Sequence, residues 1–270
     1  ALEEERELYK QRNPKSFELF NSANNLFGKV PMTWMNKWAG GFPIYLDWAK
    51  GNTVFSVDGH SYIDFALGDT TAMAGHSPEQ VGEAIHNRFT KKGGVTTMLP
   101  TEDAQWVANE LTKRFKVSKW SFSLSATDAN RWALRLSRMV TKKPKVLAVS
   151  YGYHGTVDET FVVKGENGET LLRPGNVGSP GNIEDTTRVA EFNDLESVEK
   201  ALSNADVAVI ITEPALTNIG IVLPEPGFLE GLRELATKYE ALLLIDETHT
   251  FSAGYGGDRK STRLNSSHIP

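Results

Sequence analysis

The chain has 270 residues, of which 40% are hydrophobic and 23% are charged, with a formal net charge of −5. This composition is typical of a globular chain with one large core, and an acidic balance without a basic run gives no reason to expect nucleic-acid binding. The absence of cysteine excludes disulfides and thiolate metal sites, and no apolar stretch approaches the roughly 20 residues of a membrane helix. We therefore expect a cytoplasmic protein without membrane or nucleic-acid partners.

The first part of the chain predicts a helix and a small antiparallel sheet. Residues 1–27 are typical of an exposed charged helix followed by a polar linker. Apolar and polar residues then alternate at period two in three runs, 44–48, 53–57 and 60–65. Asp58-Gly59 separates the last two runs and is a strong turn signal, because glycine accepts positive φ. We assign residues 1–75 to the helix and hairpin of a small domain.

The pattern then changes to alternating helices and strands. Helices are predicted at 77–91, 100–115, 128–140, 195–202 and 227–239, and strands at 120–124, 146–150, 207–212 and 241–245. Short runs of Val, Ile and Leu between helices favour an α/β fold with three layers and a mostly parallel sheet. Residues 164–190, rich in Gly, Asn and Pro, read as one long functional or mobile loop. We assign residues 76–257 to this large domain, which we expect to be incomplete.

The last residues do not continue this pattern. Residues 258–270 have no helical or strand periodicity, and 258–268 match the translation of a common sequencing-library adapter residue for residue. We therefore expect 258–270 to be a non-native tail and exclude it from the fold.

Four groups of polar residues follow predicted strands, where open α/β sheets place their ligands. In the first group, Ser125, Ala126 and Thr127 precede or begin a helix. Their backbone N–H groups and the helix dipole suit an anion such as phosphate. Simple capping of the helix explains the same residues.

The second group, residues 151–155, carries Tyr153 and His154 between two glycines. The glycines let the backbone turn sharply and present both rings at the edge of the sheet. A flat ring there can stack on a flat ligand. An aromatic loop that covers the end of the sheet is an equal alternative.

The other two groups contain carboxylates. Glu213 closes the strand at 207–212, either orienting other polar groups or lying exposed. Asp246 ends the strand at 241–245, where a carboxylate is costly unless a cation or several donors pair with it. The protonated nitrogen of a pyridine ring is such a partner, although a turn cap is the alternative. His249 has no second histidine at ligand spacing, so no metal site is expected.

In this order the four groups resemble the pattern of the class III aminotransferases, which have pyridoxal-phosphate fold type I. The resemblance covers about residues 35–257 and includes the stretches 39–43, 58–65 and 74–78. It is similar in particular to the branch that contains glutamate-1-semialdehyde aminomutase and β-amino-acid transaminases. The resemblance implies pyridoxal 5'-phosphate as cofactor, an amino donor and a keto-acid or aldehyde acceptor as substrates, and a homodimer.

The resemblance also implies roles for the residues of the first two groups. Ser125, Ala126 and Thr127 would hold the cofactor phosphate. Tyr153 would stack on the pyridine ring, with His154 beside it.

For the carboxylate groups, the resemblance implies that Asp246 is the catalytic partner of the ring nitrogen. Thr248 would pack on the other face of the ring, Glu213 would support the site, and His249 would lie beside the cofactor, where it is unusual.

Two further departures from the family pattern concern Ala126, where glycine is usual, and Asp128, where glutamate is usual. A methyl group at 126 would crowd the phosphate if the backbone there needs positive φ. The family's Schiff-base lysine lies a few tens of residues past Asp246, beyond this chain, and Lys260 belongs to the tail. We therefore expect the 270-residue polypeptide to be inactive and to fold poorly.

Three alternatives differ in what they require. A glutamate-1-semialdehyde-type aminomutase would return the amino group to the same carbon skeleton, which these residues do not decide. A non-catalytic pyridoxal-phosphate-binding module is favoured by Ala126 and Asp128, whereas Tyr153, His154 and Asp246 favour an enzyme. A nicotinamide-dependent oxidoreductase should carry a Gly-x-Gly-x-x-Gly turn after its first strand, and the chain has none.

Overall fold

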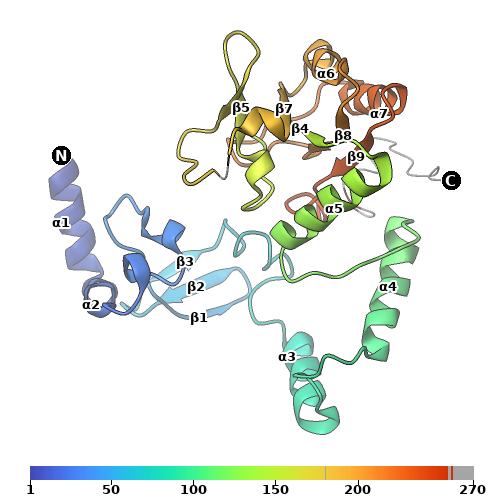
Figure 1. Cartoon of the computed structure of the whole chain (residues 1–270). Helices are drawn as coiled ribbons and strands as arrows, with labels where there is room; N and C mark the ends of the chain where they lie inside the picture. The colour runs from blue at the N-terminus through green and yellow to red at the C-terminus, as the bar shows by residue number, and fades with distance from the viewer. Residues whose placement is uncertain (180, 255–256, 258–270) are drawn as a thin grey trace. The chain divides into compact units, whose positions relative to one another are not determined.

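The computed structural model describes residues 1–179, 181–254 and 257. The chain forms two compact units, Ala1–Leu99 and a second that begins at Pro100 (Figure 1). Residues 76–99 therefore cluster with the first unit, and the functional division expected at residue 75 stays a prediction. The tail at 258–270, with Lys260, lies outside the described residues.

The first unit begins with two helices where the sequence predicted one. They are α1 (Leu2–Arg12) and α2 (Pro14–Ser22). Pro14 occupies the first turn of α2, where its missing N–H costs no helical hydrogen bond. Asp58 in the hairpin turn accepts a hydrogen bond from the Lys15 backbone N–H at 2.7 Å. The turn therefore supplies a carboxylate to the N-terminus of α2, which stabilises a second helix start.

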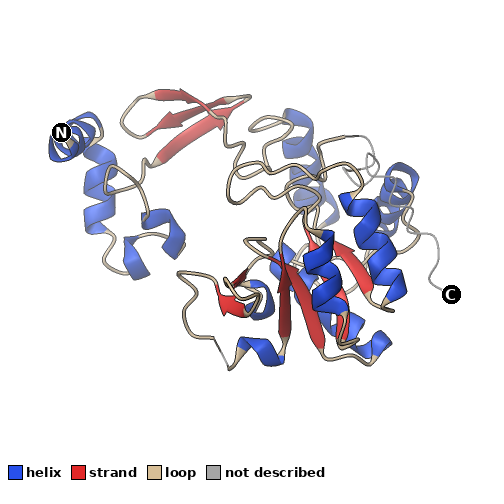
Figure 2. Ribbon diagram, turned by 90° about the horizontal axis from the view of Figure 1, so that it is seen from above, coloured by secondary structure: helices blue, strands red, loops and turns tan. Residues whose placement is uncertain are grey.

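The predicted antiparallel segment is confirmed. Its strands, which are labelled in Figure 1 and drawn in red in Figure 2, pair in the order β1-β2-β3. They are β1 (Leu46–Lys50), β2 (Thr53–Ser56) and β3 (Ser61–Ile63). Gly59 in the turn has φ 82°, as the Asp-Gly signal predicts. The other helical segments of this unit are η1 (Phe27–Lys29), η2 (Thr33–Asn36), α3 (Glu79–Asn87) and its π-helical continuation η3 (Arg88–Lys92).

The second unit contains a sheet of four parallel strands in the order β7-β4-β8-β9. The strands are β4 (Lys145–Val149), β7 (Thr187–Ala190), β8 (Val207–Thr212) and β9 (Leu242–Ile245). Every residue of β8 is buried, which fits its apolar run at 207–211. Because the strands are parallel, their carboxyl ends meet at one edge of the sheet, and all four polar groups from the sequence lie near that edge or the adjoining helix start.

Helices cover both faces of this sheet, which confirms the three-layer α/β prediction (Figure 1). Leu147 and Ile210 pack on one face with α6 (Leu195–Leu202) and α7 (Phe228–Lys238). Val146 and Val209 point to the opposite face. There they pack with Leu134 of α5 (Ala126–Thr141). The alternation of strand side chains thus divides the core into two clusters.

One predicted strand is wrong. Residues 120–124 have no strand conformation, and Leu124 is 100% exposed. Residues of this segment and of β9 line the same cavity. No described strand pairs with residues 120–124. A strand needs a neighbour for its N–H and C=O groups, so the apolar pattern alone is insufficient.

The prediction of a single long loop at 164–190 is also wrong in part. The region contains β6 (Thr170–Leu172), η5 (Ile183–Asp185) and β7, and β6 pairs with β5 (Val162–Lys164) as an antiparallel hairpin. Polar loop composition concealed these short strands. The remaining helices are α4 (Glu102–Phe115) and η4 (Asp158–Thr160). Across the described part of the chain, no helix is long and apolar enough to cross a membrane.

Candidate functional site

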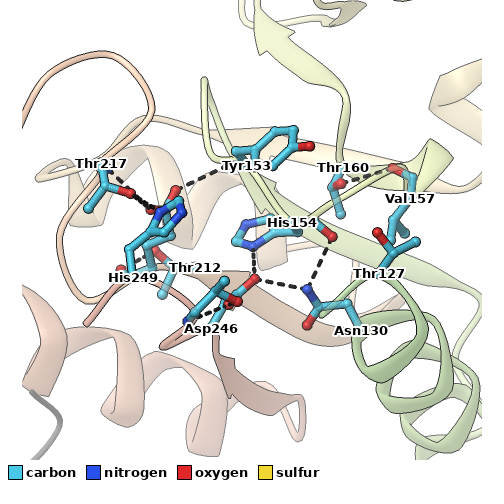
Figure 3. Close-up of polar contacts among 12 residues, drawn as sticks. Thr127, Asn130, Tyr153, His154, Val157, Thr160, Thr212, Thr217, Asp246 and His249 are labelled. Carbon is cyan, nitrogen blue, oxygen red and sulfur yellow. Dashed lines mark hydrogen bonds and ion pairs between the residues drawn. The ribbon is translucent and has the colours of Figure 1, made fainter. Parts of the chain in front are cut away.

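Asp246 follows β9, and the residue is only 8% exposed. Its Oδ2 accepts hydrogen bonds from Asn130 Nδ2 and His154 Nδ1, both at 2.8 Å. Its Oδ1 accepts from the backbone N–H of Thr248 at 3.0 Å and from the Thr248 hydroxyl. In Figure 3 Asn130 and His154 both point toward this carboxylate. Four donors thus surround one buried charge, as a buried carboxylate requires.

The surroundings of Asp246 also set its protonation. Burial by itself raises the pKa of the carboxyl group. The hydrogen bond and charge of His154, together with the two hydrogen bonds from Thr248, outweigh burial and hold this pKa well below its usual range. Asp246 therefore remains ionised at neutral pH and can pair with a cationic group.

The His154 ring is buried beside Asp246, with 1% of the residue exposed. Nδ1 donates in their hydrogen bond because an ionised carboxylate only accepts. The His154 carbonyl accepts a second hydrogen bond from Asn130 Nδ2, at 3.1 Å. Among the described residues, His154 Nε2 has no hydrogen-bond partner. A Cβ atom at Gly152 would lie 3.1 Å from this nitrogen, so the glycine leaves room beside the ring.

A second hydrogen-bonded group connects the ends of the same strands (Figure 3). Glu213 follows β8 and is buried. Its Oε1 accepts from the backbone N–H of Tyr153 at 3.1 Å. Its Oε2 accepts from the N–H and hydroxyl of Thr217 at 3.1 and 2.7 Å, and the same hydroxyl lies 2.5 Å from His249 Nδ1. Glu213 thus supports the loop that carries Tyr153.

The direction of these hydrogen bonds assigns the His249 tautomer. The Thr217 hydroxyl has one proton, which it donates to the Glu213 carboxylate. Its oxygen must therefore accept from His249 Nδ1. A neutral His249 ring then carries its proton on Nδ1 and its lone pair on Nε2.

The predicted phosphate turn forms the start of α5. Ser125 is the N-cap in an extended conformation, φ −155°, and its Oγ accepts from the Asp128 N–H at 3.2 Å. Ala126 is the first residue of the right-handed helix, so the crowding expected at a positive-φ position does not arise. The N–H groups of the first helical turn point out along the helix axis. Capping by Ser125 is therefore confirmed, and phosphate binding stays a prediction.

Thr127 lies between this turn and the Tyr153 loop. Its Oγ1 accepts from the Thr156 N–H at 3.2 Å. A Cβ atom at Gly155, where φ is +79°, would lie 2.0 Å from Thr127 Oγ1. Glycine at 155 thus allows the loop to approach α5 closely, for both backbone and steric reasons.

A cavity of about 910 Å³ adjoins the site, a volume in the range of small-molecule sites. Its polar lining includes Ser125, Asn130, Asp246, Glu247 and Thr248, and its apolar lining includes Phe115, Trp120, Leu124, Leu243 and Phe251. The predicted phosphate turn and the carboxylate thus border one cavity. Tyr153, His154, Thr127 and Glu213 lie beside it rather than in its lining.

Sequence reasoning missed two residues of the site. Asn130 belongs to the first polar group but received no role. Its signal was its position on the buried stripe of α5 with Leu134 and Ser137, where a polar side chain needs partners. Thr217 gave no comparable signal, since a hydroxyl four residues after Glu213 fits any polar loop. Among residues 1–179, 181–254 and 257, no group of three or more His, Asp or Glu side chains could hold a metal ion.

Comparisons with known proteins identify the family of this chain. A family model described as aminotransferase class-III matches residues 34–258. Glutamate-1-semialdehyde 2,1-aminomutase of Saccharolobus islandicus is 36% identical over 245 residues, which are 90% of this chain and 57% of that protein.

Solved structures show the same similarity. A glutamate-1-semialdehyde-aminomutase from Pseudomonas aeruginosa, in complex with PMP, superposes with a TM-score of 0.93 at 40% identity, over 98% of this chain and 58% of that one. A transaminase with PLP bound superposes with a TM-score of 0.84 at 28% identity, over 94% and 59%. These structures confirm fold type I, and with the family model they show that the chain belongs to the class III aminotransferases, a family whose cofactor is pyridoxal 5'-phosphate.

Proposed function

We propose that this protein binds pyridoxal 5'-phosphate at the carboxyl ends of β4, β8 and β9 and transfers an amino group between an amino acid or amine and a keto acid or aldehyde. The observation that carries the proposal is the ionised, buried Asp246 beside the N-terminus of α5. The chain spans 57% of the length of the curated relative described above, so the activity, substrates and homodimeric state of a whole protein are proposals, as is a cytoplasmic location.

The residues present fit the cofactor in charge and placement. A protonated pyridine nitrogen needs an anion, and Asp246 is held ionised by its donors. The phosphate needs N–H groups and a helix dipole, which the start of α5 provides. The Asp246 oxygens already accept four hydrogen bonds, about the capacity of a carboxylate. Thr248 is exposed, so its hydroxyl can turn away and open a place on Oδ1.

The bound cofactor would supply an electron-withdrawing ring that stabilises a carbanion next to the transferred amino group. In this proposal Asp246 holds the proton on the ring nitrogen, and His154 and Asn130 hold Asp246 in place. Ser125, Ala126 and Thr127 bind the phosphate. Glu213 orients the loop of Tyr153, whose ring stacks on the cofactor.

Thr248 and His249 complete the proposed set. Thr248 packs against the other face of the ring, and its backbone N–H keeps Asp246 Oδ1 oriented. His249 lies beside the cofactor with its orientation fixed by Thr217.

An aminomutase is the second candidate, because the relative and the solved structure of highest identity described above carry that name. The two reactions differ in where the amino group ends. With an amino donor labelled with ¹⁵N, a transaminase passes the label to a separate acceptor, whereas an aminomutase leaves the label in an isomer of the donor and consumes no separate acceptor.

The proposal is tested by titrating the 270-residue chain with pyridoxal 5'-phosphate and following cofactor absorbance and tryptophan fluorescence. We expect saturable binding, and much weaker binding of pyridoxal, which lacks the phosphate. Absence of saturable binding in a folded chain would overturn the proposed site.

The expected inactivity of this polypeptide stays a prediction, which an assay of amino transfer checks. Binding without transfer in any longer protein carrying these residues would favour the non-catalytic module.

A further inference from the structure

Asn130 lies one turn into α5, and only 6% of the residue is exposed. Its Nδ2 atom donates to Asp246 Oδ2 at 2.8 Å and to the His154 carbonyl at 3.1 Å. One amide group thus joins the carboxylate after β9 to the loop after β4, as Figure 3 shows.

The chemistry of the two partners specifies an amide. Both partners are acceptors, and the NH₂ group of asparagine has two protons, one for each. The reversed amide would place its oxygen against a carboxylate and a carbonyl, so only one orientation is stable. An apolar side chain of equal size would leave two buried acceptors without this donor, and an aspartate would add a third acceptor.

Two neighbours on the same face of α5 contact the same loop. Thr127 Oγ1 accepts from the Thr156 N–H at 3.2 Å, and Arg131 donates to the Thr156 carbonyl at 2.8 Å. Positions 127, 130 and 131 lie on one face of a helix. They bind the loop through its backbone, so the helix fixes the loop's position whatever its side chains are. Of these three, Asn130 is also bonded to Asp246.

We propose that Asn130 is a positioning residue that couples the ring-nitrogen carboxylate, Asp246, to the loop that carries Tyr153. The coupling keeps the two groups expected on the cofactor ring, one at its nitrogen and one on its face, at a fixed separation. The cofactor part of this inference rests on the proposed function, whereas the coupling itself is a property of the chain alone.

The first test measures the coupling without cofactor, by amide hydrogen exchange of residues 152–157 in the 270-residue chain. Asn130→Asp keeps the shape and removes both donors, and Asn130→Ala removes the side chain. We expect exchange about tenfold faster in Asn130→Asp, the order of one hydrogen bond to a charged group, and a smaller increase in Asn130→Ala. Leu134→Ala is the control, since it loses packing on the same helix and should accelerate exchange in β4 and β8 as well.

The second test measures the dissociation constant of pyridoxal 5'-phosphate. We expect it to rise about tenfold in Asn130→Ala and further in Asn130→Asp. The Asn130→Asp defect should shrink at pH 5, because protonation of the new carboxyl group restores a donor. If Asn130 only filled space, the dissociation constant of Asn130→Asp, which keeps the shape of the side chain, would be closer to wild type than that of Asn130→Ala.

The outcomes separate the two proposals. If the wild-type chain does not bind the cofactor, the proposed function fails and hydrogen exchange still decides the coupling. If exchange at 152–157 in both variants matches wild type, or if Asn130→Ala is the more severe change, the inference is wrong. Should both variants fail to fold, Asn130→Ser, which keeps one donor, provides the same exchange comparison.

Discussion

His154 and Asp246 are separated by 92 residues, and a 2.8 Å hydrogen bond joins His154 Nδ1 to Asp246 Oδ2. His154 follows β4 and Asp246 follows β9, with β8 between these strands in the sheet. The bond therefore joins residues on either side of the carboxyl end of β8. A buried pair of this kind costs desolvation energy, and its hydrogen bonds to Asn130 and Thr248 offset that cost.

Replacement of Asp246 tests this carboxylate directly. We expect Asp246→Asn to raise the dissociation constant of pyridoxal 5'-phosphate at least tenfold, because a neutral amide no longer pairs with a protonated ring nitrogen. The pKa of Asp246 is lowered, so its ionised form contributes stability above about pH 4 that is lost only as pH falls through the lower folded value.

The pH dependence provides the check on this interpretation. Between pH 5 and 8 Asp246 stays ionised. Its protonation should therefore contribute no change to the ratio of the dissociation constants of Asp246→Asn and wild type in this range. Fluorescence titrations at several pH values measure the ratio. Equal affinity of Asp246→Asn and wild type would contradict the assigned role.

The hydroxyl of Thr217 is expected to determine the tautomer of His249. Thr217→Val removes the hydroxyl that accepts from His249 Nδ1 and donates to Glu213. We expect ¹⁵N NMR of the neutral His249 ring to show a protonated Nδ1 in the wild-type protein, and a smaller Nδ1-protonated fraction in the variant, because the hydroxyl that accepts from Nδ1 is removed. The Thr217 N–H still bonds to Glu213, so the strand end should remain folded. A wild-type ring protonated only on Nε2 would refute the hydrogen-bond direction.

The sequence predicted the strands and helices of the second unit where apolar periodicity was strong. β8 and α6 have the predicted bounds, since an unbroken apolar run and a capped amphipathic segment leave little choice. The strand at 120–124 failed because its apolar pattern does not reveal whether a neighbouring strand is present. β5 and β6 escaped prediction because a short hairpin in a polar region carries almost no periodic signal.

For the site, strand-end position was the informative signal. It pointed to Asp246, Glu213 and His154. In the structure His154 bonds to Asp246, and Glu213 accepts from the backbone N–H of Tyr153, the residue before His154. It could not assign partners, because the Asn130–Asp246 bond joins residues 116 apart in the chain. Which acceptors the Asn130 amide meets depends on how α5 packs across the sheet, and this tertiary geometry cannot be read from the sequence.

Gly155 is predicted to be a position that tolerates no side chain. Gly155→Ala introduces a Cβ 2.0 Å from Thr127 Oγ1 at φ +79°, so it combines backbone strain with a collision. Gly175→Ala is the matched control, because φ is +88° there and nothing lies within 4 Å of the added Cβ. We expect the control to lose about 1 kcal/mol of unfolding free energy and Gly155→Ala to lose more. Equal losses in chemical denaturation would show that the loop yields without cost.

Asp206 allows a prediction at the opposite end of the sheet. It directly precedes β8, and its two oxygens accept from Arg188 Nε and Nη2 at 2.8 and 2.7 Å. The Arg188 hydrogen bonds lower the pKa of Asp206, outweighing partial burial, and Lys145 adds to the effect. Asp206→Asn should therefore reduce the free energy of unfolding at pH 7 by about 1 kcal/mol, a value kept small because the pair is partly exposed to solvent.

The sign of the pH dependence identifies the cause. A carboxyl group with a lowered folded pKa contributes stability above its unfolded pKa of about 4, and this contribution is lost as pH falls through the folded value. Urea denaturation should therefore show a gap between wild type and Asp206→Asn that is constant from pH 5 to 8 and closes below pH 4. A gap that persists at low pH would indicate lost packing instead of lost charge. Because the amino ends of these strands face away from the site, cofactor affinity should be unchanged in this variant, which makes it the charge-removal control for Asp246→Asn.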